Sequence, residues 1–376
     1  MAKRIYKAVV IGAAHMHSLY MAQDCLDNPQ IDLCGMADTL PIMQEHPGGA
    51  PFTRKWNLEF ITGRLGVCHY PDYIAMLDEV KPDVAFINTE TPLHTQVFME
   101  CAKRGIPASM EKPMAVSLSE GYKMARFARE TGGKLMVNWP MAWMPFMTQY
   151  KQILDEGRLG KLLKVRQLVA HPGPLGKGVR HPRVEETSDK TTPIEKAGTW
   201  WHNAETGGGA MLDFCCYGAM ACNWLIGERA STVMGMRCNT NSQWANADDN
   251  AAMMVRYPNC LAVLEGSWTV PASASSLGPE LYGSEAMAYL GDRDGQTSVI
   301  IRDYYGNVEV LPQLTPEPHR KNITTAFVHH MDTQEPLPDF LDMDLNLEVL
   351  AILDAGVRSA KSGKLELINN MAWEIG

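Results

Sequence analysis

The sequence predicts an α/β protein with an N-terminal doubly wound parallel sheet and a C-terminal α+β part that holds one large, mainly antiparallel open sheet. Strand-like and helix-like runs alternate over the first part of the chain, whereas strand-like runs separated by hairpin-type breaks dominate later. A chain of 376 residues suggests two domains. We place them at residues 1–140 and 141–376, and expect that the last helices can pack back on the first domain.

Composition narrows the class of protein. Hydrophobic residues make up 45% and charged residues 20%, as in an ordinary soluble globular protein. The net charge of -9 argues against nucleic acid as a partner, and the apolar run at residues 8–14 is too short to span a membrane. The nine cysteines, an odd number without Cys-x-x-Cys spacing, predict a reduced, cytoplasmic chain without a disulfide framework or a zinc site. We expect no bound metal.

The first elements outline a dinucleotide-binding unit. A Val- and Ile-rich strand over residues 5–11 leads into the turn Gly12-Ala13-Ala14-His15-Met16-His17 and a helix from Ser18, and a second strand ends at Asp38. Such a turn brings backbone N–H groups to a pyrophosphate, and the acid accepts from the ribose hydroxyls. Only the first glycine of the usual fingerprint is present, because Ala14 and His17 replace the other two. A phosphate-contacting role and a capping or surface role are equally open for the two histidines.

The alternation then continues to the end of the predicted parallel sheet. The stretch Glu111-Lys112-Pro113 closes a strand and opens a new helix, which places it outside the carboxyl ends of the strands, where such sheets bind ligands. Residues Ser117 and Glu120 form a candidate capping box. Helices are expected from 71 to 79, from an N-cap at Thr91 to Arg104, and from Ser117 to Gly132, with strands over 83–89 and 135–138.

The second half has a different pattern. A helical segment around residues 150–156 precedes a strand over 162–170, a Gly-, Pro- and charge-rich loop over 171–198, and the glycine run that starts at Gly207. Strand-like runs fill residues 231–313, with hairpin-type breaks at 257–259 and 305–307. Helices are expected over 324–331 and 345–361.

Taken in order, these segments resemble the Gfo/Idh/MocA family of oxidoreductases over nearly the whole chain. The segments that carry the resemblance are Thr89-Glu90-Thr91-Pro92-Leu93-His94, Glu111-Lys112-Pro113, Gly207-Gly208-Gly209 through Asp213, and the C-terminal order Phe327-Val328, Glu335-Pro336 and Ser362-Gly363-Lys364. The resemblance implies a Rossmann domain that binds NAD or NADP, and an open sheet that covers the nicotinamide and often forms the subunit interface.

The resemblance also implies roles for individual residues. It places a catalytic lysine at Lys112 and a substrate-orienting acid at Asp213, and puts Tyr217 where the family usually has a proton-carrying histidine. Some sugar-oxidising members also carry tyrosine there. The residues expected to bind the cofactor are Gly12, Ala14, His15, Met16, Asp38, Thr89, His94, Glu111 and Lys112. We expect NAD rather than NADP, because Thr39-Leu40-Pro41 offer no cation beside Asp38.

The chemistry of these residues suits oxidation of a secondary alcohol. If Asp213 and Tyr217 share one helix, their i, i+4 spacing puts both on one face. A neighbouring ammonium would lower the pKa of Tyr217, and burial beside a cationic nicotinamide would lower that of Lys112. The residues leave open which of the two takes the proton. Packing in the core is the alternative role for Tyr217.

Two further residues are candidate substrate contacts. Trp139 follows the last strand of the first sheet and could form a platform for a sugar, and His202 follows two tryptophans just before the glycine run. We therefore predict an NAD-dependent dehydrogenase that acts on a ring hydroxyl of a sugar, inositol or glycoside, with oxidation at C3 of a glycoside as one version. The alternatives are a keto-sugar reductase and a non-catalytic sugar-sensing regulator. A homo-oligomer through the C-terminal sheet is expected.

Overall fold

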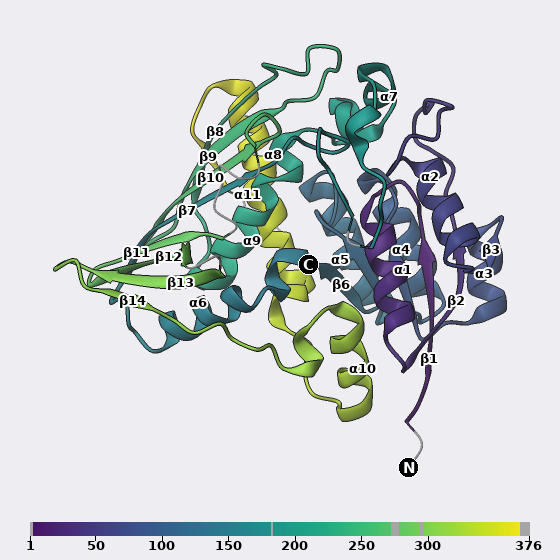
Figure 1. Ribbon diagram of the computed structural model, residues 1–376, viewed down its shortest axis with the longest axis horizontal. Coiled ribbons are helices and arrows are strands. Elements are labelled where there is room, and N and C mark those ends of the chain that lie inside the picture. The colour runs from purple at the N-terminus through teal and green to yellow at the C-terminus, as the bar shows by residue number, and fades with distance from the viewer. Residues whose placement is uncertain (1–2, 182, 272–277, 294–295, 369–376) are drawn as a thin grey trace.

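Two sheets lie side by side in the computed structural model, which describes residues 3–181, 183–271, 278–293 and 296–368 (Figure 1). The first sheet and its helices occupy the right-hand side of the view, and the second sheet occupies the left. Helices from the second half of the chain fill the space between them. Residues 369–376, the end of the expected second domain, lie outside the described residues.

The first sheet has six parallel strands in the order β3-β2-β1-β4-β5-β6. The order reverses between β1 and β4, and the carboxyl edge at such a switch point is where open α/β sheets bind ligands. The predicted doubly wound parallel sheet is confirmed. The strands are β1 (Tyr6–Ile11), β2 (Ile31–Ala37), β3 (His69–Tyr70), β4 (Val84–Ile87), β5 (Ala108–Glu111) and β6 (Leu135–Asn138).

Helices on both faces of this sheet begin and end largely at the predicted signals. The side chain of Ser117 accepts a hydrogen bond from the backbone N–H of Glu120, and Gly132 ends the same helix in the left-handed conformation (φ 70°). The predicted cap at Thr91 is wrong, because Thr91 is already the first residue of a 3-10 turn, Thr91–Leu93, preceded by Glu90. The helices are α1 (His17–Asp27), α2 (Arg54–Glu59), α3 (Tyr73–Val80), α4 (His94–Lys103) and α5 (Leu118–Thr131); α2 was not predicted.

The second sheet has nine strands in the order β14-β13-β12-β11-β7-β10-β9-β8-β15. Within the described residues, β7 and β10 pair in parallel and every other neighbouring pair of this sheet is antiparallel, which confirms the mainly antiparallel sheet. Both predicted breaks are hairpin turns, between β9 and β10 and between β13 and β14. The strands are β7 (Leu162–Ala170), β8 (Thr232–Cys238), β9 (Asn250–Arg256), β10 (Leu261–Ser267), β11 (Glu280–Gly283), β12 (Ala286–Arg293), β13 (Gln296–Asp303), β14 (Val308–Val310) and β15 (Glu366–Leu367).

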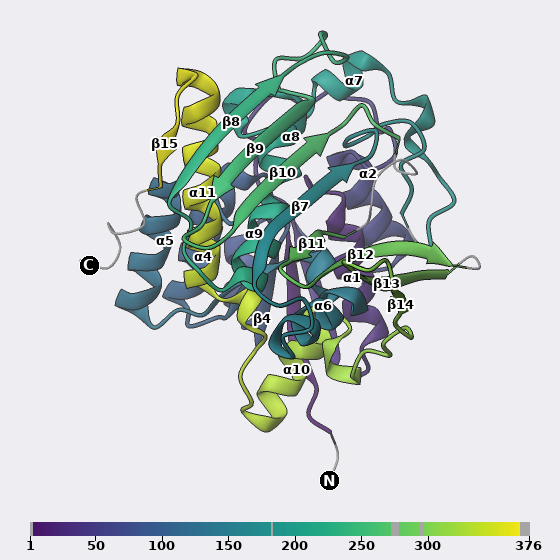
Figure 2. The same ribbon diagram turned by 90° about the vertical axis from the view of Figure 1, so that its left-hand side faces the viewer.

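Helices cover one face of the second sheet and leave the other open. Helix α9 packs on β7 and β10, and α11 packs on β8. Figure 2 shows β7, β8, β9 and β10 in front, with no helix over them. The helices of this half are α6 (Pro145–Asp155), α7 (Pro193–Ala197), α8 (Ala210–Asp213), α9 (Cys215–Ile226), α10 (Ile323–Thr333) and α11 (Met343–Ser362).

The last helices also contact the first domain. Asp332 of α10 accepts a hydrogen bond from the Tyr6 hydroxyl on β1 at 2.7 Å. Asn346 of α11 accepts one from the Trp139 indole N–H, just after β6, at 2.8 Å. The C-terminal helices α10 and α11 are therefore hydrogen-bonded to the first domain, as expected. The domain boundary at residue 140 stays a prediction.

The segment that carries Asp213 and Tyr217 is not one helix. Helix α8 ends at Asp213 and α9 begins at Cys215, and the segments on either side of the break are bent by 54°. The condition for a shared helical face, that Asp213 and Tyr217 lie on one helix, is therefore not met. In the described part of the chain no single helix is long and apolar enough to cross a membrane, and only this bent pair meets that requirement jointly.

Candidate active site

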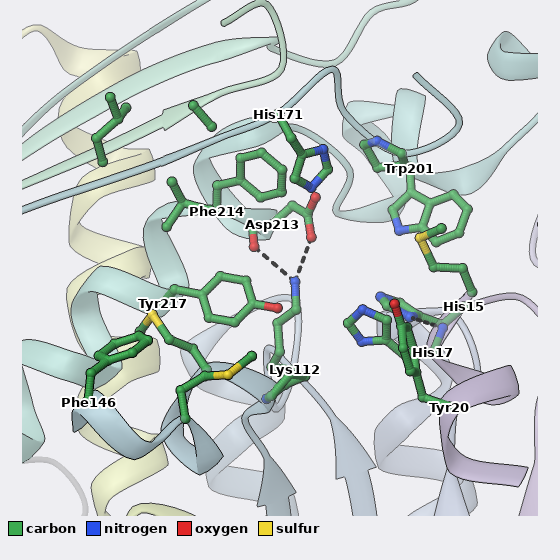
Figure 3. Close-up of a pocket in the computed structure, with 18 residues that line it drawn as sticks. His15, His17, Tyr20, Lys112, Phe146, His171, Trp201, Asp213, Phe214 and Tyr217 are labelled. Atoms are coloured by element: carbon green, nitrogen blue, oxygen red, sulfur yellow. Dashed lines mark hydrogen bonds and ion pairs between the residues drawn. The ribbon is translucent and has the colours of Figure 1, made fainter. Parts of the chain in front are cut away.

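Lys112 joins the two halves of the molecule. It follows directly on β5, at the carboxyl edge of the first sheet, and its side chain is buried. Its ammonium donates to a carboxylate oxygen of Asp213 at 2.6 Å and to the Asp213 carbonyl at 3.0 Å (Figure 3). An ammonium has three N–H donors. Two are held by Asp213, so one remains for a ligand.

The pairing with Asp213 keeps Lys112 charged. Burial lowers the pKa of Lys112, but the attraction of Asp213, followed by that of Tyr217, outweighs burial and raises the pKa well above its usual range. The expected fall of this pKa is therefore wrong for the protein itself. Lys112 is an ammonium at neutral pH and can act directly as a proton donor.

Tyr217 lies against the same ammonium. The Lys112 Nζ atom is 4.5 Å from the centre of the Tyr217 ring, and Trp139 packs edge-on behind that ring at 5.8 Å between centroids. Burial raises the pKa of Tyr217, and the opposing effect of Lys112 is smaller. Lys112 does lower this pKa, as expected, but burial outweighs that effect and the net shift is upward, so the phenol stays neutral and can donate a hydrogen bond. In Figure 3 its hydroxyl points toward the Lys112 side of the pocket.

The glycine run places Asp213 by allowing close backbone packing. Gly209 has φ 115°, and a Cβ atom there would lie 2.4 Å from a carboxylate oxygen of Asp248. That carboxylate accepts the backbone N–H of Met211 at 2.8 Å, inside α8. A Cβ atom on Gly208 would meet the Trp201 carbonyl at 2.1 Å. Side chains at these positions would push α8, and Asp213 with it, away from Lys112.

A cavity of about 490 Å³ opens around the Lys112–Asp213 pair. Its walls combine aromatic rings and methionines with a few polar groups. The lining residues are His15, Met16, His17, Tyr20, Lys112, Pro140, Met141, Met144, Phe146, Leu168, Val169, Ala170, His171, Pro174, Trp201, Asp213, Phe214 and Tyr217.

His171 is a site residue that the sequence analysis treated only as the start of a loop. It follows β7, lines the cavity, and packs on Phe214 at 4.5 Å between ring centroids. Burial lowers its pKa, so the imidazole is neutral. Its Nδ1 accepts the backbone N–H of Gly173 at 3.1 Å, which leaves the proton on Nε2 as a donor. The available signal was its place at the end of a strand of the second sheet.

The two expected substrate contacts lie elsewhere. Trp139 is fully buried behind Tyr217, with its indole N–H bound to Asn346, so it cannot form a platform for a sugar. His202 is also buried, away from the Lys112 cavity, between Trp244 and Trp268 at 4.9 and 5.3 Å between ring centroids. Both expectations are corrected. Trp201, next to His202, is the tryptophan that lines the cavity.

The turn before α1 has the shape that a dinucleotide site requires. Gly12 has φ 100°, and a Cβ atom there would lie 2.5 Å from the backbone nitrogen of Thr89. Ala14 is buried, and its carbonyl accepts the Trp200 indole N–H at 3.3 Å. His15 and Met16 continue the turn into the cavity. The turn therefore packs closely on the residues that follow β4 and is also held by Trp200 from the second half of the chain.

Asp38 directly follows β2 and lies beside this turn, as predicted. A cation that was not predicted lies next to its carboxylate. Its carboxylate accepts the backbone N–H of Ala13 at 3.0 Å and the guanidinium of Arg54 at 2.7 Å. Arg54 also pairs with Glu45 at 2.9 Å and with Glu90. The expectation of no cation near Asp38 is wrong, because α2 brings in Arg54 from 16 residues further along the chain. That cation is shared among three carboxylates.

The other expected cofactor residues lie beneath or beside the turn. Thr89 is buried under Gly12. His94 is buried, and its Nδ1 lies 3.2 Å from the Met114 carbonyl, so it braces the segment after Glu111-Lys112-Pro113. Glu111 is buried next to Lys112, and neither of its carboxylate oxygens has a hydrogen-bond partner.

These residues fit a dinucleotide. The backbone of the Gly12 turn and the start of α1 would hold the pyrophosphate, Asp38 the adenosine ribose, and Lys112 would lie beside the nicotinamide. The observation that supports this is the turn itself, where a side chain at Gly12 is sterically excluded.

Comparison with known proteins agrees with this geometry. Trans-1,2-dihydrobenzene-1,2-diol dehydrogenase from Macaca fuscata fuscata is 27% identical over 226 residues, which cover 59% of this chain and 58% of that enzyme. The match therefore spans less than two thirds of that relative. Scyllo-inositol 2-dehydrogenase (NAD(+)) from Bacillus subtilis is 20% identical over 305 residues, covering 78% of this chain and 81% of that enzyme.

The fold is shared with solved structures. Myo-inositol 2-dehydrogenase from Lactobacillus plantarum superimposes with a TM-score of 0.72 at 19% identity, covering 97% of this chain and 100% of that one. Residues 7–139 match the oxidoreductase family with an NAD-binding Rossmann fold, and residues 147–289 match the GFO/IDH/MocA C-terminal domain. The chain belongs to the Gfo/Idh/MocA family of oxidoreductases, and its first domain is that family's NAD-binding domain.

Proposed function

We propose that this protein is an NAD-dependent dehydrogenase that oxidises a ring hydroxyl of a sugar, inositol or glycoside, or reduces the corresponding ketone. The observation that supports this most strongly is the buried Lys112–Asp213 pair, with Tyr217 on its face, at the end of an enclosed cavity. Bound NAD would supply the hydride acceptor. The chain itself supplies the groups that bind the substrate oxygen and move its proton.

Lys112 is the proton-handling group in this proposal. Its third N–H donates to the reacting oxygen of the substrate, while Asp213 holds the ammonium in place. Because its pKa is raised, the resting ammonium is ready to protonate a ketone oxygen in the reductive direction. In the oxidative direction Lys112 must first lose a proton. The same raised pKa is the specific observation that favours keto-sugar reduction as the second candidate.

The neutral groups around Lys112 orient the substrate. The Tyr217 phenol and the His171 Nε2–H are donors that can bind hydroxyl or carbonyl oxygens next to the reacting carbon. Asp213 keeps a carboxylate oxygen near the cavity, where it can accept from a hydroxyl. Donors and an acceptor on one side of a ring suit a substrate with neighbouring oxygens.

The rest of the cavity favours a substrate with an apolar part. Phe146, Met141, Met144 and Trp201 all line the cavity. Aromatic rings pack against the C–H face of a sugar, and methionines adapt to apolar groups of varied shape. This arrangement supports a glycoside with an apolar aglycone, and oxidation at its C3 position is the version we favour.

A substrate screen tests the proposal. The purified protein with NAD is mixed with inositols, free sugars and aryl glycosides, and reduced nicotinamide is followed by absorbance. We expect formation with at least one ring alcohol, with glycosides above the matching free sugars, and none with Lys112→Ala. A panel without turnover in either direction, despite NAD binding, would instead favour a non-catalytic sugar-sensing regulator.

We also propose a homo-oligomer through the open face of the second sheet. Met236 is 72% exposed and Met254 is 51% exposed on neighbouring strands of that face. Apolar side chains grouped on an uncovered sheet suit burial by a second copy. Met236→Glu with Met254→Glu should dissociate the assembly in sedimentation experiments without unfolding it. A wild-type protein that sediments as a monomer would contradict this.

A further inference from the structure

Three potential metal ligands meet beside Lys112. His15 and His17 come from the turn before α1, and Glu111 comes from the end of β5, so residues almost a hundred positions apart converge. Each offers one ligand atom, and these atoms lie within 4.8 Å of one another. Figure 3 shows both imidazoles facing the Lys112 side of the cavity that they line. The cluster is therefore placed at the reacting end of the site.

Glu111 is the member that most clearly lacks a partner. Its side chain is 1% exposed, and neither carboxylate oxygen makes a hydrogen bond. One of these oxygens lies 3.1 Å from the His17 Nδ1 atom, yet the orientation does not make a hydrogen bond. A buried carboxylate without hydrogen bonds is unfavourable, so a group that satisfies it is expected. Two imidazoles turned toward the same point favour a cation.

The distances and the donor types suit a transition ion. Two bonds of about 2.1 Å that meet at an angle of 90–109° put the ligand atoms about 3.0–3.4 Å apart. The His17–Glu111 separation of 3.1 Å is within that range. Two histidines with one carboxylate form a ligand set of catalytic zinc and of iron(II). His15 would contribute its Nε2 atom, because its Nδ1 accepts the backbone N–H of His17 at 3.1 Å.

The charges nearby also permit a cation. Lys112 is the nearby positive group, and its charge is already balanced by Asp213 at 2.6 Å. Glu111 has no such counter-charge among the described residues, apart from the His17 contact.

We propose that His15, His17 and Glu111 bind a divalent first-row transition ion, such as Zn²⁺, whose open coordination positions face the cavity beside Lys112. An ion there would coordinate an oxygen of a ring diol or hydroxyketone and so fix the substrate against Lys112. The proposal concerns binding by the protein alone and does not depend on hydride transfer. Cysteine spacing could not reveal the site, because none of its ligands is a cysteine.

Metal titration of the tag-free, full-length protein tests the site. After treatment with a chelator, the protein is titrated with Co²⁺, followed by its ligand-field absorption, and with Zn²⁺, followed by calorimetry. We expect one saturable site per chain. His17→Gln and Glu111→Gln should each weaken binding by at least about 100-fold, because losing a direct ligand exceeds the 10–100-fold effect of losing a supporting contact.

The matched control is the partly exposed histidine pair His319 and His329, whose rings stack at 4.0 Å and which each contact a glutamate. His319→Gln with His329→Gln should leave the tight site unchanged. The proposal is overturned if the wild type has no saturable site, if only this surface variant loses it, or if His17→Gln and Glu111→Gln bind as the wild type does. Should either cluster variant fail to fold, His15→Gln and Glu111→Asp answer the same question.

Discussion

Glu111 and Lys112 are neighbours in the chain, and both are buried, but the protein treats their charges differently. Lys112 is held by two hydrogen bonds to Asp213 from the other domain. Glu111 faces two imidazoles and has no hydrogen bond on either oxygen. The satisfied charge has a fixed place, and its raised pKa keeps it protonated. The unsatisfied one is the basis of the proposed metal site.

This difference shows that two kinds of observation point to function. A tight pair across a domain interface identifies a group that must keep its position during chemistry. An orphaned buried group identifies a position that a bound species completes. Arg54 is a third case. This buried cation is shared among Asp38, Glu45 and Glu90, so the carboxylates outnumber the positive charge that pairs with them.

Removing the paired lysine should have the largest effect. Lys112→Ala should lower turnover by about 10⁴-fold or more, at the top of the range for a general acid–base group. The protein should stay folded and bind NAD with modest loss, although Asp213 loses its partner and stability falls by at most about 3–5 kcal/mol. Steady-state rates with calorimetry for NAD measure both effects.

Lys123→Ala, at an exposed lysine that pairs with Glu120, is the control. Equal rates in Lys112→Ala and Lys123→Ala would refute the assignment.

Tyr217→Phe should have an intermediate effect. It removes one hydrogen-bond donor to the substrate, worth about 10–10²-fold in the chemical step, and keeps the ring against Lys112 and Trp139. Because the phenol is neutral, the pH–rate profile should keep its shape. Single-turnover hydride transfer measures this. A profile that loses one limb would show that Tyr217, and not Lys112, exchanges the proton, whereas an unchanged rate would make Tyr217 a packing residue.

The smallest effect concerns cofactor choice at Arg54. Three carboxylates around one guanidinium leave a net negative site, so NAD should bind more tightly than NADP. Glu90→Gln removes one negative charge and should shift the NADP-to-NAD affinity ratio by about tenfold toward NADP, equivalent to roughly one pKa unit of electrostatic interaction. Fluorescence titration with both cofactors measures the ratio. Tighter binding of NADP by the wild type would contradict the expected preference.

Local patterns predicted most elements of the fold. The strands over residues 31–37 and 162–170 and the helix between Ser117 and Gly132 agree with the structure because hydrophobic periodicity and caps act within a few residues. Helix α2 was missed, and the break at Phe214 was not seen. Just before α8, Gly208 packs against Trp201 and Gly209 packs against Asp248, and the contact with Asp248 is distant in sequence.

The site was predicted in part. The Lys112–Asp213 pair and the neighbouring Tyr217 do meet, as the family resemblance implied. The errors all involve contacts that only tertiary structure creates: Arg54 beside Asp38, Trp139 behind Tyr217, and His202 away from the cavity. The net pKa directions of Lys112 and Tyr217 are opposite to those expected. The Asp213 charge raises the pKa of Lys112, and burial raises the pKa of Tyr217. His171 carried no recognisable motif.

The measurement that tests the central claim most directly is the pH dependence of single-turnover oxidation in the wild type and in Asp213→Asn. With Asp213 present, the raised pKa of Lys112 should make the oxidation rate increase with pH throughout the neutral and mildly alkaline range, since the base form grows as protons are lost. In Asp213→Asn the burial of Lys112, which lowers its pKa, should dominate, so the rising limb should move to lower pH even if the maximal rate falls. A limb at the same pH in both proteins would show that Asp213 does not control the proton of Lys112.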